Sequence, residues 1–95
     1  MDFFHKFLEW GLNGNVWIWF HIFGGEFYGK FARYKLDKIT TFLSLFAITI
    51  AWELYEFLID GGVPGMIAIY GSLERWAYDS AGDILGALLA CLLVL

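Results

Sequence analysis

The 95-residue chain has little of several residue types that define common protein classes. It contains one cysteine and one proline, and only 17% of its residues are charged. A single cysteine excludes a disulfide-stabilised scaffold, because such a scaffold needs pairs of cysteines. With six basic residues against ten acidic ones, the chain also lacks the positive surface that binds nucleic acids, so we expect no nucleic-acid partner.

The chain has an excess of apolar residues. Hydrophobic residues make up 60% of the sequence, aromatic residues make up 21%, and the mean hydropathy is +0.64. A soluble domain has about 45–50% apolar and about 25% charged residues, so this composition departs from both values. It excludes a disordered chain and favours a single domain that contacts a lipid bilayer.

Long uncharged segments, which normally mark a transmembrane helix, are missing too. No uncharged run reaches the about 18 residues that such a helix usually shows. The uncharged runs at 39–52 and 84–95 become long enough to cross a bilayer only if neighbouring acidic residues belong to the same helices. Acidic side chains are therefore predicted inside the membrane-spanning segments.

The pattern along the chain predicts an all-α membrane protein in which residues 1–95 form a single transmembrane domain. Residues 2–12 are apolar on one helical face and polar on the other, which indicates a short amphipathic helix at the membrane interface. Three transmembrane helices are predicted at 16–34, 39–59 and 75–95. Asp60-Gly61-Gly62 is predicted to end the second of them, and 63–74 to form a loop or a short interfacial piece.

Basic residues indicate how these helices are oriented. Four of the six lie together at the end of the first predicted span and in the connection to the second: Lys30, Arg33, Lys35 and Lys38. Because cytoplasmic loops are enriched in basic residues, we expect this connection to face the cytoplasm and the N-terminus to lie outside.

Polar residues inside the predicted spans share helical faces. In 39–59 they recur at spacings of four, three and four residues, at Thr49, Glu53, Glu56 and Asp60. In 75–95, Asp79 and Asp83 are followed on the same face by Gly86 and Ala90, small residues that let a neighbouring helix approach. In 16–34, one face carries His21, Gly25 and Tyr28, and Gly25 forms a small-residue pair with Gly29.

Helix rise places three of these ionisable residues at one depth. His21, Glu53 and Asp83 are expected about 8 to 10 Å below the same side of the membrane. An ionisable residue in a bilayer costs about 2.5–3.5 kcal/mol on insertion scales. We therefore expect these side chains to face each other or a hydrated cavity.

Two interpretations of the acidic cluster stay open. In the first, a divalent cation is held by His21, Glu53, Glu56, Asp79 and Asp83. Carboxylates favour Mg²⁺, Mn²⁺ or Ca²⁺, and the imidazole of His21 also admits Zn²⁺. In the second, Glu53 and Asp83 are protonated or bridged and join the helices as polar contacts.

Three separated motifs resemble the pattern of the VanZ/YjdF-like group of small membrane proteins, over residues 17–90: His21-x3-Gly25, Trp52-Glu53-Leu54-Tyr55-Glu56, and Tyr78-Asp79-x3-Asp83-x2-Gly86. The resemblance implies a polytopic protein of the bacterial inner (plasma) membrane with a poorly defined activity, and some relatives are linked to the cell envelope. Those relatives usually have more spans. Either the shared core is all that is present, or other subunits of a larger membrane complex complete it. Three spans with polar faces also suggest self-association, so we expect a homo-oligomer or such a complex.

Two enzyme families share shorter fragments of the pattern. Asp60-Gly61 followed by Asp79-x3-Asp83 resembles part of the CDP-alcohol phosphotransferase signature, although Pro64-Gly65 and Arg75 depart from it. Glu56-x3-Asp60 before a final helix looks like bacterial diacylglycerol kinase, without that family's asparagine-rich catalytic segment. Both imply a metal-dependent enzyme acting on lipid-linked phosphates. A further hypothesis, besides a cation-binding or structural membrane protein and such an enzyme, is that the chain is an accessory subunit of a larger complex. No catalytic residue is predicted.

Overall fold

The computed structural model describes residues 2–95. Within that range the chain forms five α-helices and one π-helical segment and no strand, which confirms the all-α prediction. The elements are α1 (Phe3–Lys6), η1 (Phe7–Asn13), α2 (Ile18–Ala32), α3 (Lys38–Ile59), α4 (Gly62–Tyr70) and α5 (Leu73–Val94).

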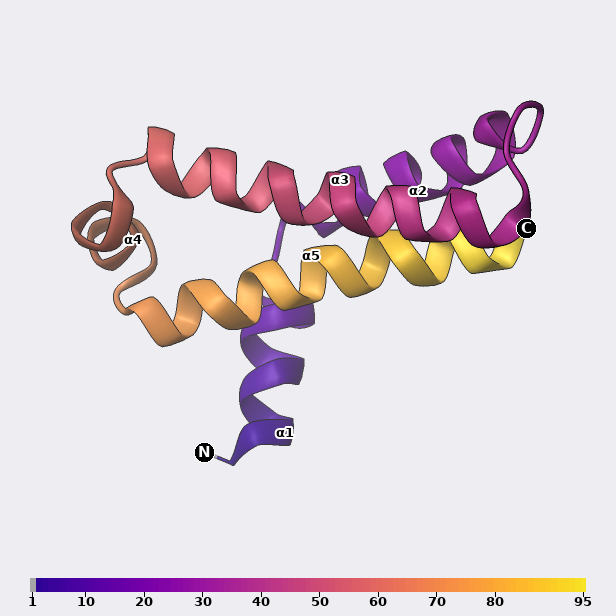
Figure 1. Ribbon diagram of the computed structural model, residues 1–95. Helices are drawn as coiled ribbons and strands as arrows, with labels where there is room; N and C mark the ends of the chain where they lie inside the picture. The colour runs from indigo at the N-terminus through magenta and orange to yellow at the C-terminus, as the bar shows by residue number, and fades with distance from the viewer. Residues whose placement is uncertain (1) are drawn as a thin grey trace.

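The two longest helices, α3 and α5, run antiparallel and are joined through α4 (Figure 1). Each has 22 residues, and each is long and apolar enough to cross a membrane. At 1.5 Å per residue they extend about 33 Å, against about 30 Å for the hydrocarbon core of a bilayer. Their most apolar windows are only 17% and 39% buried within the chain, so most of this apolar surface faces outward.

Side-chain caps set where these two helices begin. The carboxylate of Asp37 accepts a hydrogen bond of 2.6 Å from the backbone N–H of Thr40, and the hydroxyl of Ser72 accepts one of 3.0 Å from the N–H of Arg75. Such caps satisfy N–H groups that have no partner inside the helix. The helices therefore start one and two residues before the predicted positions 39 and 75.

Helix α2 is shorter than predicted. It has 15 residues, from Ile18 to Ala32, where the sequence pattern predicted 16–34. After Ala32 the chain turns, and the guanidinium of Arg33 donates a hydrogen bond of 2.8 Å to the carbonyl of Leu36. At about 22 Å, α2 falls short of the about 30 Å core of a bilayer. Two of the three predicted spans therefore have the required length, and α2 by itself does not.

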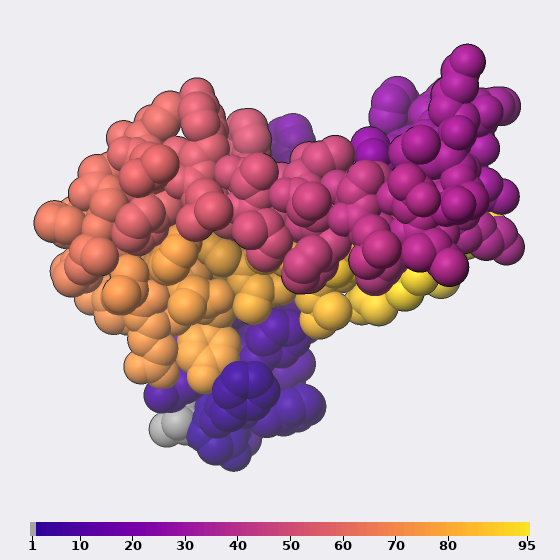
Figure 2. All heavy atoms as spheres, viewed as in Figure 1, coloured from indigo at the N-terminus to yellow at the C-terminus, as the bar shows by residue number. Residues whose placement is uncertain are grey.

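The predicted interfacial helix at 2–12 corresponds to α1 and η1, which project from the side of α5 (Figures 1 and 2). The crossing is close, because a Cβ added to Gly82 of α5 would collide with the carbonyl of Gly11 in η1. Around it, the rings of Trp10 and Tyr78 lie 5.7 Å apart. Two glycines thus let the N-terminal segment rest on the N-terminal half of α5.

Helix α2 packs on α5 through small residues, as its glycine pair predicted. A Cβ at Gly25 would collide with the backbone of Ala87, and one at Gly29 would come within 2.9 Å of the Sγ of Cys91. Ala87 and Cys91 are both buried. This close approach of two backbones brings the side chain of His21 next to α5.

The segment predicted as a loop or a short interfacial piece contains the nine-residue helix α4. The chain reverses at Gly61, just before α4, and at Gly62, its first residue, which have φ values of +103° and +65°. Glycine adopts this left-handed region without the steric cost that other residues meet. The prediction that Asp60-Gly61-Gly62 ends the preceding helix is therefore confirmed.

Candidate metal centre

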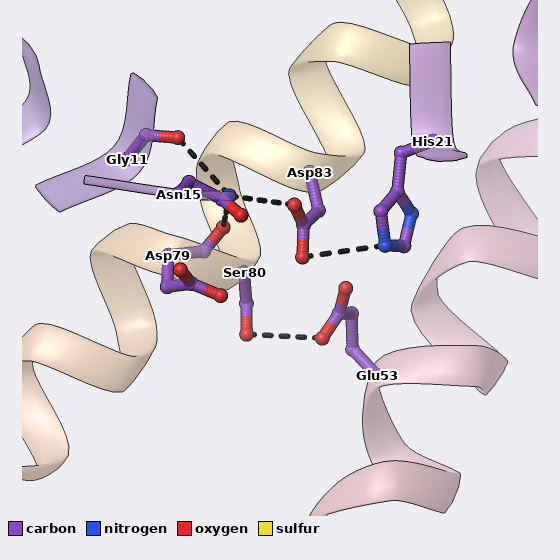
Figure 3. A network of polar contacts seen from close by, with 7 residues as sticks. All are labelled: Gly11, Asn15, His21, Glu53, Asp79, Ser80 and Asp83. Carbon is purple, nitrogen blue, oxygen red and sulfur yellow. Dashed lines mark hydrogen bonds and ion pairs between the residues drawn. The ribbon is translucent and has the colours of Figure 1, made fainter. Parts of the chain in front are cut away.

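Three side chains converge inside the bundle, one from each of its long elements (Figure 3). His21 comes from α2, Glu53 from α3 and Asp83 from α5, and one ligand atom of each lies within 4.8 Å of the others. Glu53 and Asp83 are buried, with exposed fractions of 8% and 5%, and His21 is half-buried. The sequence-based prediction that these three side chains face each other is consistent with this arrangement.

The carboxylate of Asp83 is held from two sides. Its Oδ2 lies 3.4 Å from Nε2 of His21, and its Oδ1 accepts a hydrogen bond of 2.6 Å from Nδ2 of Asn15. Because the two contacts hold different oxygens, the carboxylate has little freedom to rotate. One oxygen is thereby directed at the imidazole, in the space that Glu53 also faces (Figure 3).

Asn15 is a central residue of the site that the sequence pattern did not reveal. The two N–H groups on its Nδ2 are shared among three acceptors: the carbonyls of Gly11 (3.2 Å) and Asp79 (3.1 Å) and the carboxylate of Asp83. With an exposed fraction of 4% it is buried, and its Oδ1 has no hydrogen-bond partner. The Asn13-Gly14-Asn15 sequence indicates only a turn, so no local signal marks this role.

Glu53 is oriented by a neighbour on α5. The hydroxyl of Ser80 donates a hydrogen bond of 3.1 Å to Oε2 of Glu53. Ser80 lies three residues before Asp83, so both side chains occupy the same face of α5. The second carboxylate oxygen of Glu53 is left facing Asp83 and His21 (Figure 3).

Two of the five predicted ligands lie outside this group. Glu56 and Asp79 are half-buried, and neither belongs to the set of ligand atoms within 4.8 Å of one another. Asp79 contributes its backbone carbonyl to Asn15. Glu56 lines a groove between α2 and α3. The structure thus assembles His21, Glu53 and Asp83, with Asn15 and Ser80 as their hydrogen-bond donors.

The charges at the centre are unbalanced. Two carboxylates face one imidazole, and the lysine ion pair found among residues 2–95 joins Lys6 to Glu74, away from the centre. Arg75 lies over the ring of Trp10, 5.6 Å from its centre, and so it also points elsewhere. A bound cation or a shared proton would supply the missing positive charge.

The donor set and spacing fit a divalent metal ion. Two ligands about 2.1 Å from a tetrahedral metal lie about 3.4 Å from each other, and Nε2 of His21 and Oδ2 of Asp83 are 3.4 Å apart. One imidazole nitrogen with two carboxylate oxygens suits Zn²⁺ and Mn²⁺. Because Glu53 enters from a third helix, three protein ligands would leave a coordination position for water.

Protein-family models, curated proteins and solved structures all gave no match.

Proposed function

We propose that this protein is a small integral membrane protein that binds a divalent cation at His21, Glu53 and Asp83. The observation that carries the proposal is the convergence of one ligating side chain from each of α2, α3 and α5 within 4.8 Å. Each ligand is fixed by a helix, and two of them are also fixed by hydrogen bonds from Asn15 and Ser80. A cation at this point would link all three helices.

Zn²⁺ and Mn²⁺ are the ions we favour among Mg²⁺, Mn²⁺, Ca²⁺ and Zn²⁺. Mg²⁺ and Ca²⁺ prefer oxygen ligands, and Ca²⁺ takes six to eight of them, whereas this centre offers one nitrogen and two carboxylates. Imidazole and carboxylate together are common ligands of Zn²⁺ and are accepted by Mn²⁺. The half-buried His21 provides the side of the centre that is open to a further ligand.

The membrane arrangement is part of this proposal. Helices α3 and α5 cross the bilayer, α2 enters it part of the way, and the segment α1–η1 lies at the interface with Phe3 and Phe4 exposed to lipid. The basic connection between α2 and α3 faces the cytoplasm, as expected from the positive-inside rule. We propose the bacterial inner membrane as the location, and a homo-oligomer or a larger complex as the assembly.

A phosphate-transferring enzyme is less consistent with the site. Such an enzyme needs cationic groups that stabilise the charge of the transferred phosphate. His21 is the one basic side chain at the centre among the described residues, and Arg75 packs on Trp10 instead. Cation binding without phosphoryl transfer therefore remains the better-supported function.

Metal analysis of the purified full-length chain tests the proposal. After incubation with ZnCl₂ or MnCl₂ and desalting, we expect about one ion per chain by elemental analysis, as for a single site with three protein ligands. The variants Glu53→Gln, Asp83→Asn and His21→Gln should each lose the bound ion. Asp60→Asn is the matched control, because Asp60 is an exposed acid at the end of α3 and should leave the metal content unchanged.

The alternative is a centre held by shared protons. It is favoured by one observation, that the buried carboxyl groups of Glu53 and Asp83 lie within 4.8 Å of each other, since two like charges at close range favour protonation of one of them. In that case the wild-type protein would contain no stoichiometric metal, and the amide variants would melt at or above the wild-type temperature. That pair of results would refute the cation centre.

A further inference from the structure

A groove of about 500 Å³ lies between α2 and α3, beside the metal centre. Its walls are mostly apolar and include Phe20 and Gly24 from α2 and Ile48 and Trp52 from α3, and Ala87 of α5 contributes to the lining. The volume lies within the range of about 300–1,000 Å³ that small-molecule sites occupy. The groove exists because α2 packs closely on α5 at Gly25, while Gly24 next to it faces open space.

The two ends of the groove carry different polar groups. At the end near α4, His21 and Glu56 line it. At the opposite end, the hydroxyls of Tyr28 and Ser44 share a hydrogen bond of 2.6 Å that joins the two walls. The groove therefore has ionisable side chains at one end, and at the other a hydrogen bond between two hydroxyls bridges its walls.

The length of the groove matches one leaflet of a bilayer. Its α3 wall runs from Leu45 to Glu56 and its α2 wall from Trp17 to Tyr28, and each extends about 16 Å along its helix. Half of the hydrocarbon core of a bilayer measures about 15 Å. The end with the ionisable side chains lies near the end of α3, where the membrane surface is expected. A lipid chain in this groove would thus keep the depth it has in the bilayer.

Charge limits which head group can occupy the end with the ionisable side chains. Glu56 lies in the groove lining, and Glu53 and Asp83 lie next to His21 just behind it. A divalent cation at the centre offsets the charges of Glu53 and Asp83, so the charge of Glu56 is the one left over. It disfavours an anionic phosphate, because like charges at close range repel. A hydroxyl group, in contrast, can donate a hydrogen bond to the carboxylate of Glu56.

We propose that this groove binds the acyl chain of a single-chain lipid with an uncharged, hydroxyl-bearing head group, of which a monoacylglycerol is the simplest example. The inference rests on the membrane placement proposed above. His21 lines the groove and also faces Asp83 in the metal centre. The lipid head group therefore lies beside the coordination position that three protein ligands leave open.

Tryptophan fluorescence gives a direct test, because Trp17 and Trp52 line the groove. The full-length chain in detergent micelles is titrated with a monoacylglycerol brominated on its chain, and separately with a phosphatidylglycerol carrying the same brominated chain. We expect saturable quenching by the monoacylglycerol at low mole fraction and only non-saturable quenching by the phosphatidylglycerol. Saturable binding that favours the anionic lipid would overturn the proposal.

A blocking variant separates the groove from general contact with detergent. In Gly24→Leu the new side chain enters the groove, and a Cβ there meets no atom within 4 Å, so the fold should tolerate it. We expect the apparent Kd for the monoacylglycerol to weaken about tenfold or more, because the leucine occupies space that the chain needs. Ala47→Leu adds the same side chain at an exposed position of α3 that does not line the groove, and should bind like wild type.

Further measurements on the same samples complete the test. Glu56→Gln should reduce the difference in affinity between the monoacylglycerol and the phosphatidylglycerol, because the carboxylate that repels the phosphate is removed. If Gly24→Leu and the wild-type protein bind the monoacylglycerol with equal affinity, the groove is not the lipid site. If the wild-type protein is a dimer and Gly24→Leu makes it monomeric, the groove holds a second copy of the chain, and the lipid proposal is also refuted. Metal content is read in parallel. Metal without saturable lipid binding refutes only the lipid site, and lipid binding without metal refutes only the cation centre.

Discussion

The side-chain amide of Asn15 donates a hydrogen bond of 2.6 Å to the carboxylate of Asp83, across 68 positions of sequence. Asn15 lies in the turn before α2, and Asp83 lies in the middle of α5. The same amide also binds the carbonyls of Gly11 and Asp79. One buried side chain therefore fixes the N-terminal segment, the start of α2 and a ligand of the candidate metal centre relative to one another.

Replacing Asn15 by alanine should destabilise the protein more than a turn residue normally would. The change leaves a buried carboxylate oxygen and two carbonyls without this donor, and an unsatisfied buried polar group costs about 1–3 kcal/mol. We expect a lower free energy of unfolding in dodecyl maltoside, measured by denaturant titration. Asn13→Ala is the control, because Asn13 is exposed and two residues away. Equal stability of the two variants would contradict the role assigned to Asn15.

Alanine substitutions at the adjacent residues Gly24 and Gly25 of α2 should change the stability of the protein in opposite directions. A Cβ at Gly25 would collide with the backbone of Ala87, whereas one at Gly24 meets nothing within 4 Å. Overpacking of this kind typically costs about 1–3 kcal/mol. Gly24→Ala should instead stabilise α2 by about 0.5–1 kcal/mol, since alanine has less conformational freedom to lose in a helix. The melting temperatures of the two variants, compared with wild type, check this, and a Gly25→Ala protein as stable as Gly24→Ala would show that α2 and α5 are not in close contact.

Much of the candidate site was predictable because helix geometry is local. The four-residue spacings place residues on one face, and the rise per residue gives their depth, so His21, Glu53 and Asp83 could be placed together from sequence. Glu56 shows the limit of that reasoning. It is turned about 60° from Glu53 around the helix axis, and which neighbour covers that sector depends on the packing of α2. In the structure the sector faces the groove instead of the centre.

What the sequence could not predict depends on contacts between distant segments. Asn15 finds Asp83 only because Gly11 and Gly82 let η1 cross α5, and no periodicity records such a crossing. The length of α2 was overestimated for a related reason. No glycine or proline follows Ala32 to mark the end of the helix, but the chain must turn there to return along α3, and the turn is stabilised by the contact of Arg33 with the carbonyl of Leu36.

The stability of the first turn of α3 should decrease at acidic pH. The backbone N–H of Thr40 donates a hydrogen bond to Asp37, and this contact lowers the pKa of that carboxyl below its usual range. The stabilisation is therefore complete above the usual pKa of an aspartate, and is lost as the pH falls through the lowered value. Hydrogen exchange at the start of α3 should accelerate in acid relative to the rest of the helix, after correction for the intrinsic rate.

Two variants separate this titration from capping itself. Asp37→Asn keeps a side-chain acceptor for Thr40 and should remove the pH dependence while preserving protection from exchange at neutral pH. Asp37→Ala should lose the protection at every pH. If Asp37→Asn retained the acid sensitivity of the wild type, another group would have to titrate there.

Metal binding should stabilise the whole bundle, because the proposed ligands come from three helices. An ion present at 100 times its Kd stabilises the folded state by about 2.7 kcal/mol if it does not bind the unfolded chain. The melting temperature of the wild-type protein should therefore rise with added ZnCl₂ and fall back when EDTA is added. Glu53→Gln should show no such response, whereas Asp60→Asn, an exposed change outside the centre, should respond like wild type. A zinc-dependent shift that survives in Glu53→Gln would place the stabilising ion elsewhere on the protein.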